Sequence, residues 1–487
     1  MISVKNHFIK KSCAKNVKRI VKSGVKNVKH ILLFELKSDI ICMEEMDMKR
    51  KIYDELINWK NNKDNIKPLM LLGVRQSGKT YIINEFCKNE YKNYIYINLF
   101  ENDNIVNLYN SNLTSLEKFQ QLKVLLGAST DIEKNDTIIF IDEIQESEKL
   151  ISELKYFCEN HNNLRIICAG SLLGVKLKRS KFSFPVGKVK LLNMYPMDFE
   201  EFLWAMGEEL LVSLIKDCYK FNKNMDTSVH EKAINLYKKY LITGGMPESI
   251  KNMTNTNGDY VLYDKTILSD ILTSYFNDMD KYVTSENEAL KINRVYNSLP
   301  SQLSNLSNKF QYTKVIKDAR ARDYETALDW LLASNMVIKC KCVKNPEIPL
   351  EGFVEQDTFK LYLSDVGILN NVLKINIQDI LTDNISLYKG IIAENFVANQ
   401  LCSQGHDLYY WKNKNEAEID FLLYNNDGII PIEVKAGNNS QSKSLKVYMD
   451  RYKPKYAIRI STKEFGYDKV NKIKSIPLYA TFVLSEK

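Results

Sequence analysis

Residues 69–80 read Leu69-Met70-Leu71-Leu72-Gly73-Val74-Arg75-Gln76-Ser77-Gly78-Lys79-Thr80. The apolar run predicts a buried strand, and the next eight residues have the spacing G-x-x-x-x-G-K-T, which we call the phosphate loop. Its glycines let backbone N–H groups point at phosphate oxygens, and a helix over about residues 80–87 adds its positive N-terminal end. Lys79 is expected to pair with the phosphates, and Thr80 to offer its hydroxyl to Mg²⁺. The stretch therefore predicts an α/β fold that binds a nucleoside triphosphate.

Two further strands supply candidate residues for the same site. The apolar stretch 137–141 ends in Asp142 and Glu143, the pattern of a buried parallel strand with acids at its carboxyl end. Asp142 is expected to hold Mg²⁺ through water, and Glu143 to act as the general base for hydrolysis. The alternative is a strand with a solvated acidic end. A third strand, 164–170, precedes Ser171, whose hydroxyl either senses the γ-phosphate or simply begins a helix.

Length and composition set limits on the class of protein. A chain of 487 residues with 45% hydrophobic content is long enough for roughly two to four domains. Its nine cysteines are scattered without a CxxC pair and its five histidines are dispersed, which predicts a reduced, cytoplasmic protein without structural zinc or disulfides. No apolar run approaches the roughly eighteen residues that span a bilayer, so no membrane partner is expected.

The net charge of +8 is concentrated at the N-terminus. Residues 1–30 contain eight Lys, one Arg and no acid, so they carry +9 and the remainder carries −1. Overall charge therefore gives no argument for binding nucleic acid. The basic extension, residues 1–47, is a nucleic-acid arm, a signal-like segment without a cleavage site, or a leader that is not translated. We expect the true start near Met48.

The order of signals along the chain predicts several parts. Strands and helices alternate over about residues 66–200, which predicts a parallel sheet covered by helices, and we assign residues 48–205 to this nucleotide-binding core. Residues 206–300 are expected to form a helical lid. Within the lid, the turn Gly244-Gly245-Met246-Pro247 either places Pro247 over the nucleotide base or only separates two helices.

Residues 301–350 have the pattern of a winged helix. Two short amphipathic helices are expected over residues 312–319 and 324–332, and a β-rich segment follows at 337–343. Such an arrangement places its second helix in a DNA groove in many proteins, and serves as a protein-binding spacer in others. The basic residues in this segment that favour DNA contact are few, Arg320 and Arg322.

The last expected domain, residues 351–487, contains a second chemical constellation. Two strands, 416–424 and 429–435, flank the turn 425–428, so Tyr424 is expected to face Ile429. Counting back from that pair places Asp420 opposite Glu433 and Glu418 opposite Lys435, and period-two alternation places all four on one face. Two opposed carboxylates repel unless a cation or a proton lies between them. Mg²⁺ satisfies this need, and D-x(12)-E-x-K is a pattern by which a metal activates water to cleave phosphodiesters.

A helix is expected to bring a third acid to this site. Ile391, Glu394, Ala398 and Leu401 fall on one helical face, so Glu394 interrupts an apolar stripe. A carboxylate there is costly unless it is paired or bound to a metal. The predicted metal ligands are therefore Glu394, Asp420 and Glu433. The alternative is that Glu394 lies at the edge of the stripe while Glu418 and Lys435 form a simple salt bridge.

Ten motifs occur in the order known from a widespread family of bacterial and archaeal AAA-type ATPases with a C-terminal domain of unknown function. The chain resembles this family over about residues 48–450 through GVRQSGKT, IIFIDEIQ, AGSLLG, FPVGKV, YPMDFEEFL, GGMPE, LSDVGIL, AENFVANQL, YYWKNKNEAEIDFLL and IPIEVKAG. The resemblance implies a relationship to the STAND and archaeal ATPase groups, in which the GG-x-P turn contacts nucleotide. The chain departs from ATPases that assemble into an active ring, because it has no convincing arginine finger. The nearest candidates are Arg179 and Lys188.

The C-terminal part resembles the PD-(D/E)xK nuclease fold, and the resemblance implies that Glu394, Asp420, Glu433 and Lys435 match that fold's acids and lysine. The expected fold class is thus α/β, with a P-loop NTPase parallel sheet, a helical lid, a winged-helix-like segment and a C-terminal restriction-endonuclease-like domain. The expected function is slow, Mg²⁺-dependent ATP hydrolysis that controls the chain's own DNA-directed winged helix and nuclease-like C-terminal domain. The alternatives are a signalling or scaffold switch that binds a protein partner, and a vestigial nuclease fold that binds DNA without cutting it.

Overall fold

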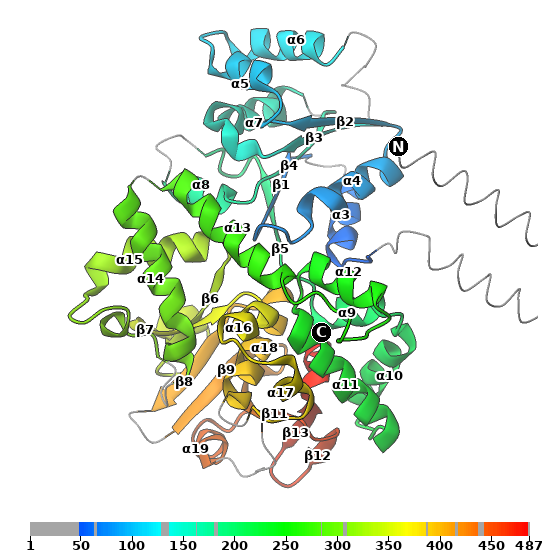
Figure 1. Cartoon of the computed structure of the whole chain (residues 1–487), viewed down its shortest axis with the longest axis vertical. Coiled ribbons are helices and arrows are strands. Elements are labelled where there is room, and N and C mark those ends of the chain that lie inside the picture. The colour runs from blue at the N-terminus through cyan, green and yellow to red at the C-terminus, as the bar shows by residue number, and fades with distance from the viewer. Residues whose placement is uncertain are drawn as a thin grey trace, which may run out of the picture. The chain divides into compact units, whose positions relative to one another are not determined.

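A computed structural model describes most of the chain. The described residues are 48–62, 66–127, 136–161, 163–179, 184–283, 285–304, 309–385, 388–413, 417–436 and 443–485. Residues 49–487 form one compact unit, and the description below is confined to it (Figure 1). The expected basic extension, residues 1–47, lies outside the described residues.

The phosphate loop follows the first strand of a five-stranded sheet in which every neighbouring pair is parallel. In the order β2-β3-β4-β1-β5, the strands are β1 (Leu69–Gly73), β2 (Asn93–Asn98), β3 (Thr137–Asp142), β4 (Arg165–Ala169) and β5 (Lys190–Met194). This confirms the predicted parallel sheet. Because β4 alone separates β1 from β3, the phosphate loop and the acids after β3 emerge at the same edge of the sheet.

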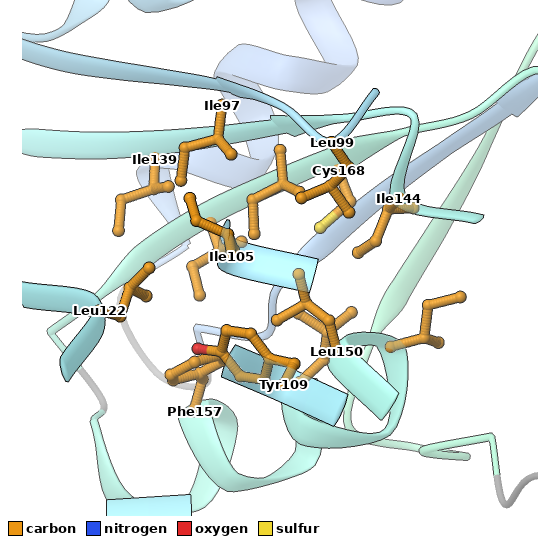
Figure 2. Close-up of a cluster of buried hydrophobic side chains, with 14 of the residues drawn as sticks. Ile97, Leu99, Ile105, Tyr109, Leu122, Ile139, Ile144, Leu150, Phe157 and Cys168 are labelled. Carbon is orange, nitrogen blue, oxygen red and sulfur yellow. The ribbon is translucent and has the colours of Figure 1, made fainter. Parts of the chain in front are cut away.

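Helices cover both faces of this sheet, because strand alternation sends apolar side chains to either side. They are α3 (Ile52–Asn61), α4 (Lys79–Glu90), α5 (Asp103–Asn110), α6 (Ser115–Leu125), α7 (Glu148–Asn160) and α8 (Leu173–Arg179). Ile139 packs with Tyr109 and Phe157 of α5 and α7 in one buried cluster (Figure 2). Its neighbour Phe140 joins the opposite cluster, which contains residues of α3 and α4.

The predicted lid is helical throughout most of its length. Over residues 206–300 it comprises α10 (Glu209–Phe221), α11 (Thr227–Thr243), α12 (Pro247–Asn255), α13 (Ile267–Tyr282) and most of α14 (Glu286–Leu303). Helix α9 (Phe199–Ala205) precedes it at the end of the predicted core. Asp198 caps α9 in a reciprocal capping box with Glu201, and Pro247 begins α12, where its fixed φ and missing N–H suit the first helical position.

An eight-stranded mixed sheet holds the rest of the chain, with the order β12-β13-β11-β10-β9-β8-β6-β7. Its strands are β6 (Val337–Val343), β7 (Val354–Leu363), β8 (Tyr409–Asn413), β9 (Ala417–Asn425), β10 (Gly428–Lys435), β11 (Ala457–Ser461), β12 (Gly466–Asp468) and β13 (Ile473–Pro477). Strand β6 pairs antiparallel with β7 and parallel with β8. The boundary expected at residue 350 therefore falls between two paired strands of one continuous sheet.

The remaining helices are α15 (Ala321–Ala333), α16 (Val366–Val372), α17 (Ile377–Leu381), α18 (Lys389–Ser403) and α19 (Lys443–Tyr452). The helix expected over residues 324–332 is confirmed within α15. The α-helix expected over residues 312–319 is wrong, since only Tyr312–Lys314 form a 3-10 helix and Asp318 has a φ of +65°. Among the described residues no helix combines the length and apolar character needed to cross a bilayer.

Candidate functional site

The phosphate loop turns sharply between β1 and α4. Gly78 directly precedes α4 with a φ of +90°, a conformation that a side chain would strain. Lys79 is buried, and its Nζ donates to the carbonyl oxygens of Gly73 at 3.0 Å and Val74 at 2.9 Å. Burial lowers the pKa of Lys79 to about 8, although Glu143 and Asp142 oppose the shift. The loop thus presents an ammonium group held by its own backbone.

Thr80 and Asp142, the two residues predicted to hold the same Mg²⁺ ion, are in contact. Thr80 Oγ1 donates to Asp142 Oδ2 at 2.8 Å, and the Tyr96 hydroxyl donates to the same oxygen at 3.2 Å. The N–H of Glu143 donates to Asp142 Oδ1 at 3.0 Å. A hydroxyl and a carboxylate side by side are the oxygen donors that Mg²⁺ prefers, so these residues fit the ion.

Glu143 is held in an unusual backbone conformation directly after β3. Its φ is +53°, which is uncommon and costly for a residue with a side chain. Its carboxylate accepts a hydrogen bond from Gln145 Nε2, and Gln145 is itself fully buried. Gln145 was not among the predicted site residues. The sequence feature that could have identified Gln145 is its position two residues after Glu143, directly beyond the predicted strand.

A buried arginine supports the phosphate loop from the other side. Arg50 is 6% exposed, and its guanidinium donates to the carbonyl oxygens of Ser77 at 2.9 Å and Tyr195 at 2.7 Å. It also forms an ion pair with Glu201 at 3.2 Å. The hydroxyl of Tyr275, from the lid helix α13, donates to the carbonyl of Arg75 at 3.0 Å. The loop is therefore held by α13 and by Arg50, which lies two residues before α3.

The GG-x-P turn reaches the phosphate loop. Pro247 Cγ lies 3.5 Å from the position that a Cβ would take on Gly78. Behind the proline, the N–H of Gly245 donates to Asp365 Oδ2 at 2.6 Å. Gly244 has a φ of +63°, and a Cβ there would lie 2.1 Å from Asp365 Oδ1, so this position requires glycine.

Asp365 is buried between the turn and α16, whose first turn it caps. Burial raises the pKa of Asp365 to about 6, against the opposing effect of the N–H groups of Gly245, Ile368 and Gly367. One carboxylate thus joins the turn beside the phosphate loop to the helix that follows β7.

The other predicted residues near the nucleotide site lie as follows. Ser171 comes two residues after β4 and lines a small pocket together with Val74 and Arg75. Lys188, one of the arginine-finger candidates, forms an ion pair with Glu159 at 2.9 Å, and Arg179 ends α8.

Strands β9 and β10 pair in the predicted register. Tyr424 faces Ile429, and the paired residues end with Phe421 opposite Ile432. The same register, continued by one residue, places Asp420 opposite Glu433. The N–H of Val434 donates to Asp420 Oδ2 at 2.7 Å. The regular alternation predicted for β9 is interrupted, because its pairing with β8 shifts by one residue between Ile419 and Leu422.

A fully buried lysine lies among the predicted acids. Lys360 Nζ contacts Glu394 Oε1 at 2.8 Å and Glu418 Oε1 at 2.7 Å, with its side chain 0% exposed. The Tyr362 hydroxyl also donates to Glu394. Burial lowers the pKa of Lys360, but Glu394, Glu418 and Asp420 outweigh burial and raise the pKa well above its ordinary value. The predicted acid Glu394 is therefore held by residues of β7.

The other half of this charged cluster contains Asp420, Glu433 and Lys435. Lys435 Nζ lies 2.5 Å from Glu433 Oε1, so the alternative Glu418–Lys435 salt bridge is replaced by other pairs. Burial raises the pKa of Asp420 well above its ordinary value, and Glu394 and Glu433 reinforce the shift. In the part of the chain that the structure describes, no three His, Cys, Asp or Glu side chains are arranged to hold a metal ion.

Helix α15 would be the groove-reading helix of a winged helix. Its exposed residues at and after its N-terminus are Arg320, Ala321, Arg322, Glu325, Thr326 and Asp329. Their charges balance, so this face has no excess of cations to attract phosphate groups.

Comparisons with known families divide the chain into three segments. Residues 65–203 match the family described as AAA domain. Residues 234–379 and 389–480 match two domains of unknown function, DUF8612 and DUF4143. A protein of Methanocaldococcus jannaschii described as uncharacterized is 25% identical over 428 residues, covering 83% of this chain and 82% of the relative.

Solved structures are similar at lower levels. A Walker-type ATPase of Pyrococcus abyssi is 17% identical with a TM-score of 0.42, covering 68% of this chain and 96% of that chain. The ORC2 protein of Aeropyrum pernix is 13% identical with a TM-score of 0.35, covering 69% and 93%. The family match and the loop, strand order and acids described above lead to one conclusion. Residues 65–203 match the AAA domain family and form a parallel α/β sheet of the P-loop NTPase type.

Proposed function

We propose that this chain binds ATP with Mg²⁺ at the phosphate loop and hydrolyses it slowly. The observation that carries the proposal is the 2.8 Å contact between Thr80 and Asp142, with Glu143 adjacent. Thr80 lies in α4 after β1, and Asp142 ends β3. These two strands are separated by β4, yet the two residues meet at one edge of the sheet.

Each residue has a defined role in this proposal. Lys79 exchanges its backbone carbonyl partners for phosphate oxygens, and the N–H groups of the loop and of the first turn of α4 bind the same anion. Thr80 and Asp142 would hold Mg²⁺, which supplies neutralising charge on the phosphates. Glu143 accepts a proton from the attacking water, and Gln145 keeps the Glu143 carboxylate oriented.

The proposal also assigns the nucleotide's effect on the rest of the chain. Pro247 would contact the nucleotide base, and Ser171 would sense the γ-phosphate. A shift of Pro247 moves Gly245, and Gly245 is bonded to Asp365 at the start of α16. We therefore propose that nucleotide state controls the C-terminal part through this turn, in a cytoplasmic protein whose described cysteines are all free.

Phosphate release by the purified chain tests the proposed hydrolysis. Glu143→Gln is expected to keep ATP affinity and lower turnover by about 10²- to 10⁴-fold, because it removes only the general base. Lys79→Ala is expected to weaken ATP binding by roughly ten- to a hundredfold, the value of a charge-assisted hydrogen bond. Unchanged turnover in Glu143→Gln, or unchanged affinity in Lys79→Ala, would reject the assignment.

A second candidate function is phosphodiester cleavage by the C-terminal cluster, under ATP control and directed to DNA. It is favoured by the register that brings Asp420 opposite Glu433, with Lys435 on the same strand. Against it, Lys360 already forms ion pairs with Glu394 and Glu418, and the acids do not converge as metal ligands in the described residues. No catalytic step is therefore derived for this site.

Plasmid cleavage with Mg²⁺ or Mn²⁺, with and without ATP, tests this second candidate beside an Asp420→Ala control. Cleavage that the control loses would establish a nuclease. No cleavage, with ATP binding intact, would favour the competing proposal, a nucleotide-dependent switch whose C-terminal part binds a protein partner or DNA without cutting it.

A further inference from the structure

A basic groove lies in the C-terminal part, apart from the charged cluster around Lys360. Its volume is about 770 Å³, and it is lined by α19, β11 and the segment between β12 and β13. Seven of the lining side chains are charged. Two are acidic, Asp450 and Asp468, and five are basic: Lys443, Lys446, Lys453, Arg459 and Lys472.

The five cations outnumber the two acids of the groove. Hydrogen bonds from Asn471 lower the pKa of Asp468, and the nearby Arg459 adds to that shift, so Arg459 is partly offset. Within the described residues none of them forms an ion pair, whereas Lys455 nearby is paired with Asp427. Asp468 is occupied by its own turn, since it accepts hydrogen bonds from the N–H groups of Val470 and Asn471, both at 3.0 Å. The groove is therefore a local excess of positive charge on a chain whose charge outside residues 1–30 is −1.

Two of these lysines occupy backbone positions that disfavour a side chain. Lys453 has a φ of +47° and Lys472 a φ of +54°. The left-handed conformation costs roughly 1–2 kcal/mol for such a residue, and glycine or asparagine adopts it more readily. Both strained positions lie on the groove, so a cation is placed there at a cost to local stability.

Three of the cations lie along α19 and at its end. Lys443 and Lys446 lie about one turn apart on the helix, Asp450 follows them on the same side, and Lys453 comes directly after the last helical residue. At a rise of ~1.5 Å per residue the helix extends over about 14 Å, longer than a single phosphate group. An extended anion with several charges matches this arrangement better than a compact one.

We infer that this groove binds the phosphodiester backbone of a nucleic acid. The contacts are those of lysine and arginine with phosphate oxygens, which are sequence-independent and release counterions. Helix α15, with its balanced charges, lacks this property. The inference does not require that the cluster around Lys360 cuts anything, since the groove recognises the backbone whether or not a bond is broken.

Fluorescence anisotropy of the full chain with labelled 30-nucleotide probes tests the inference. The probes are duplex DNA, single-stranded DNA and RNA, titrated in EDTA at several salt concentrations, so that cleavage plays no part. The groove variant is Lys446→Gln, Lys453→Asn and Lys472→Asn, because asparagine tolerates the left-handed conformation. The matched control is Lys314→Gln, Lys317→Gln and Arg322→Gln, which removes the same charge beside and on α15.

The native chain is expected to bind at least one probe, and the groove variant to lower the slope of log K against log salt by about 2 to 3, from roughly 0.7–0.9 for each phosphate contact. The control should keep the native slope, and Lys→Arg at the three groove positions should restore it. The inference is overturned by the absence of binding to all probes, or by a slope that the control changes and the groove variant does not. The probe that binds tells DNA from RNA.

Discussion

At the scale of single residues, Lys360 determines the character of the C-terminal cluster. It is enclosed by β7, α18 and β9, and it compensates two carboxylates that burial would otherwise make costly. Lys360 is also 4.9 Å from the ring centre of Tyr410, so an aromatic face covers the ammonium as well. Lys360, Lys412 and Lys435 form ion pairs with three of the four acids of this cluster.

Replacing Lys360 is therefore expected to be severe. Lys360→Met should lower the free energy of unfolding by about 3–5 kcal/mol, because it removes the buried ammonium group that pairs with both Glu394 and Glu418. Urea unfolding followed by circular dichroism measures the change. The matched control is Lys341→Met on the neighbouring strand, where the ion pair with Glu351 is partly exposed and worth about 1 kcal/mol or less. Equal losses in the two variants would contradict this account of Lys360.

The residues predicted from sequence differ in one physical respect from those that only the structure reveals. Lys79, Thr80, Asp142 and Glu143 belong to short motifs whose spacing alone specifies a turn beside a strand end. Lys360 carries no such mark, since a lysine in an alternating strand normally faces solvent, and its partners Glu394 and Glu418 lie 34 and more residues away. Arg50 was missed for the same reason, because its acceptor on Ser77 is 27 residues distant.

At the scale of elements, the GG-x-P turn and α16 share the carboxylate of Asp365. Because burial raises its pKa to about 6, the folded chain holds this proton to a higher pH than the unfolded chain does. The contribution of Asp365 to stability is therefore fully present below about pH 4 and is lost as the pH rises through about 6. A shift of about two pKa units corresponds to at most about 3 kcal/mol.

Asp365→Asn is expected to remove this pH dependence. The amide cannot ionise, and its NH₂ would face an N–H of Gly245 or of Ile368, so the variant loses one accepted hydrogen bond. Urea unfolding at pH 4, 5, 6 and 7 should show the native chain's advantage over the variant shrinking as the pH rises. A constant difference across this range would show that Asp365 does not titrate between the two states.

Sequence patterns predicted these elements unevenly. The strands of the first sheet are continuous apolar runs with turns at their ends, so β1, β3 and β4 were located to within a residue or two. The helix expected over residues 312–319 failed because an amphipathic pattern there does not outweigh a left-handed residue at Asp318. The interruption of β9 was invisible, because a one-residue shift depends on the partner strand β8.

At the scale of the molecule, β6 belongs to the same sheet as β7 and β8, although the predicted boundary at residue 350 lies between β6 and both of these strands. It pairs with β7 on one side and with β8 on the other, so the sheet expected to begin after residue 350 actually requires β6, which ends at Val343. Parallel pairing between distant strands leaves no local signal in the sequence, which is why the boundary was drawn too late.

A fragment of residues 351–487 is therefore expected not to fold. It lacks β6, which would leave β7 detached and the edge of β8 unpaired. A longer fragment, residues 285–487, retains α14, α15 and β6 and should show a cooperative urea transition by circular dichroism. Cooperative unfolding of the short fragment would mean that β6 is dispensable and that the boundary near residue 350 separates independent domains.

The two sheets are also completed at different times while the chain is being synthesised. The first sheet is complete once β5 has left the ribosome, whereas the second must wait for β13, whose last residue is Pro477. At translation rates of about 5–20 residues per second, roughly 15 to 55 seconds separate these two moments. Within that interval β6 is made before its partner strand β8, and Lys360 before its partners Glu394 and Glu418. A nucleotide bound at the completed phosphate loop would stabilise the folded N-terminal part of the chain while the C-terminal part is still being synthesised.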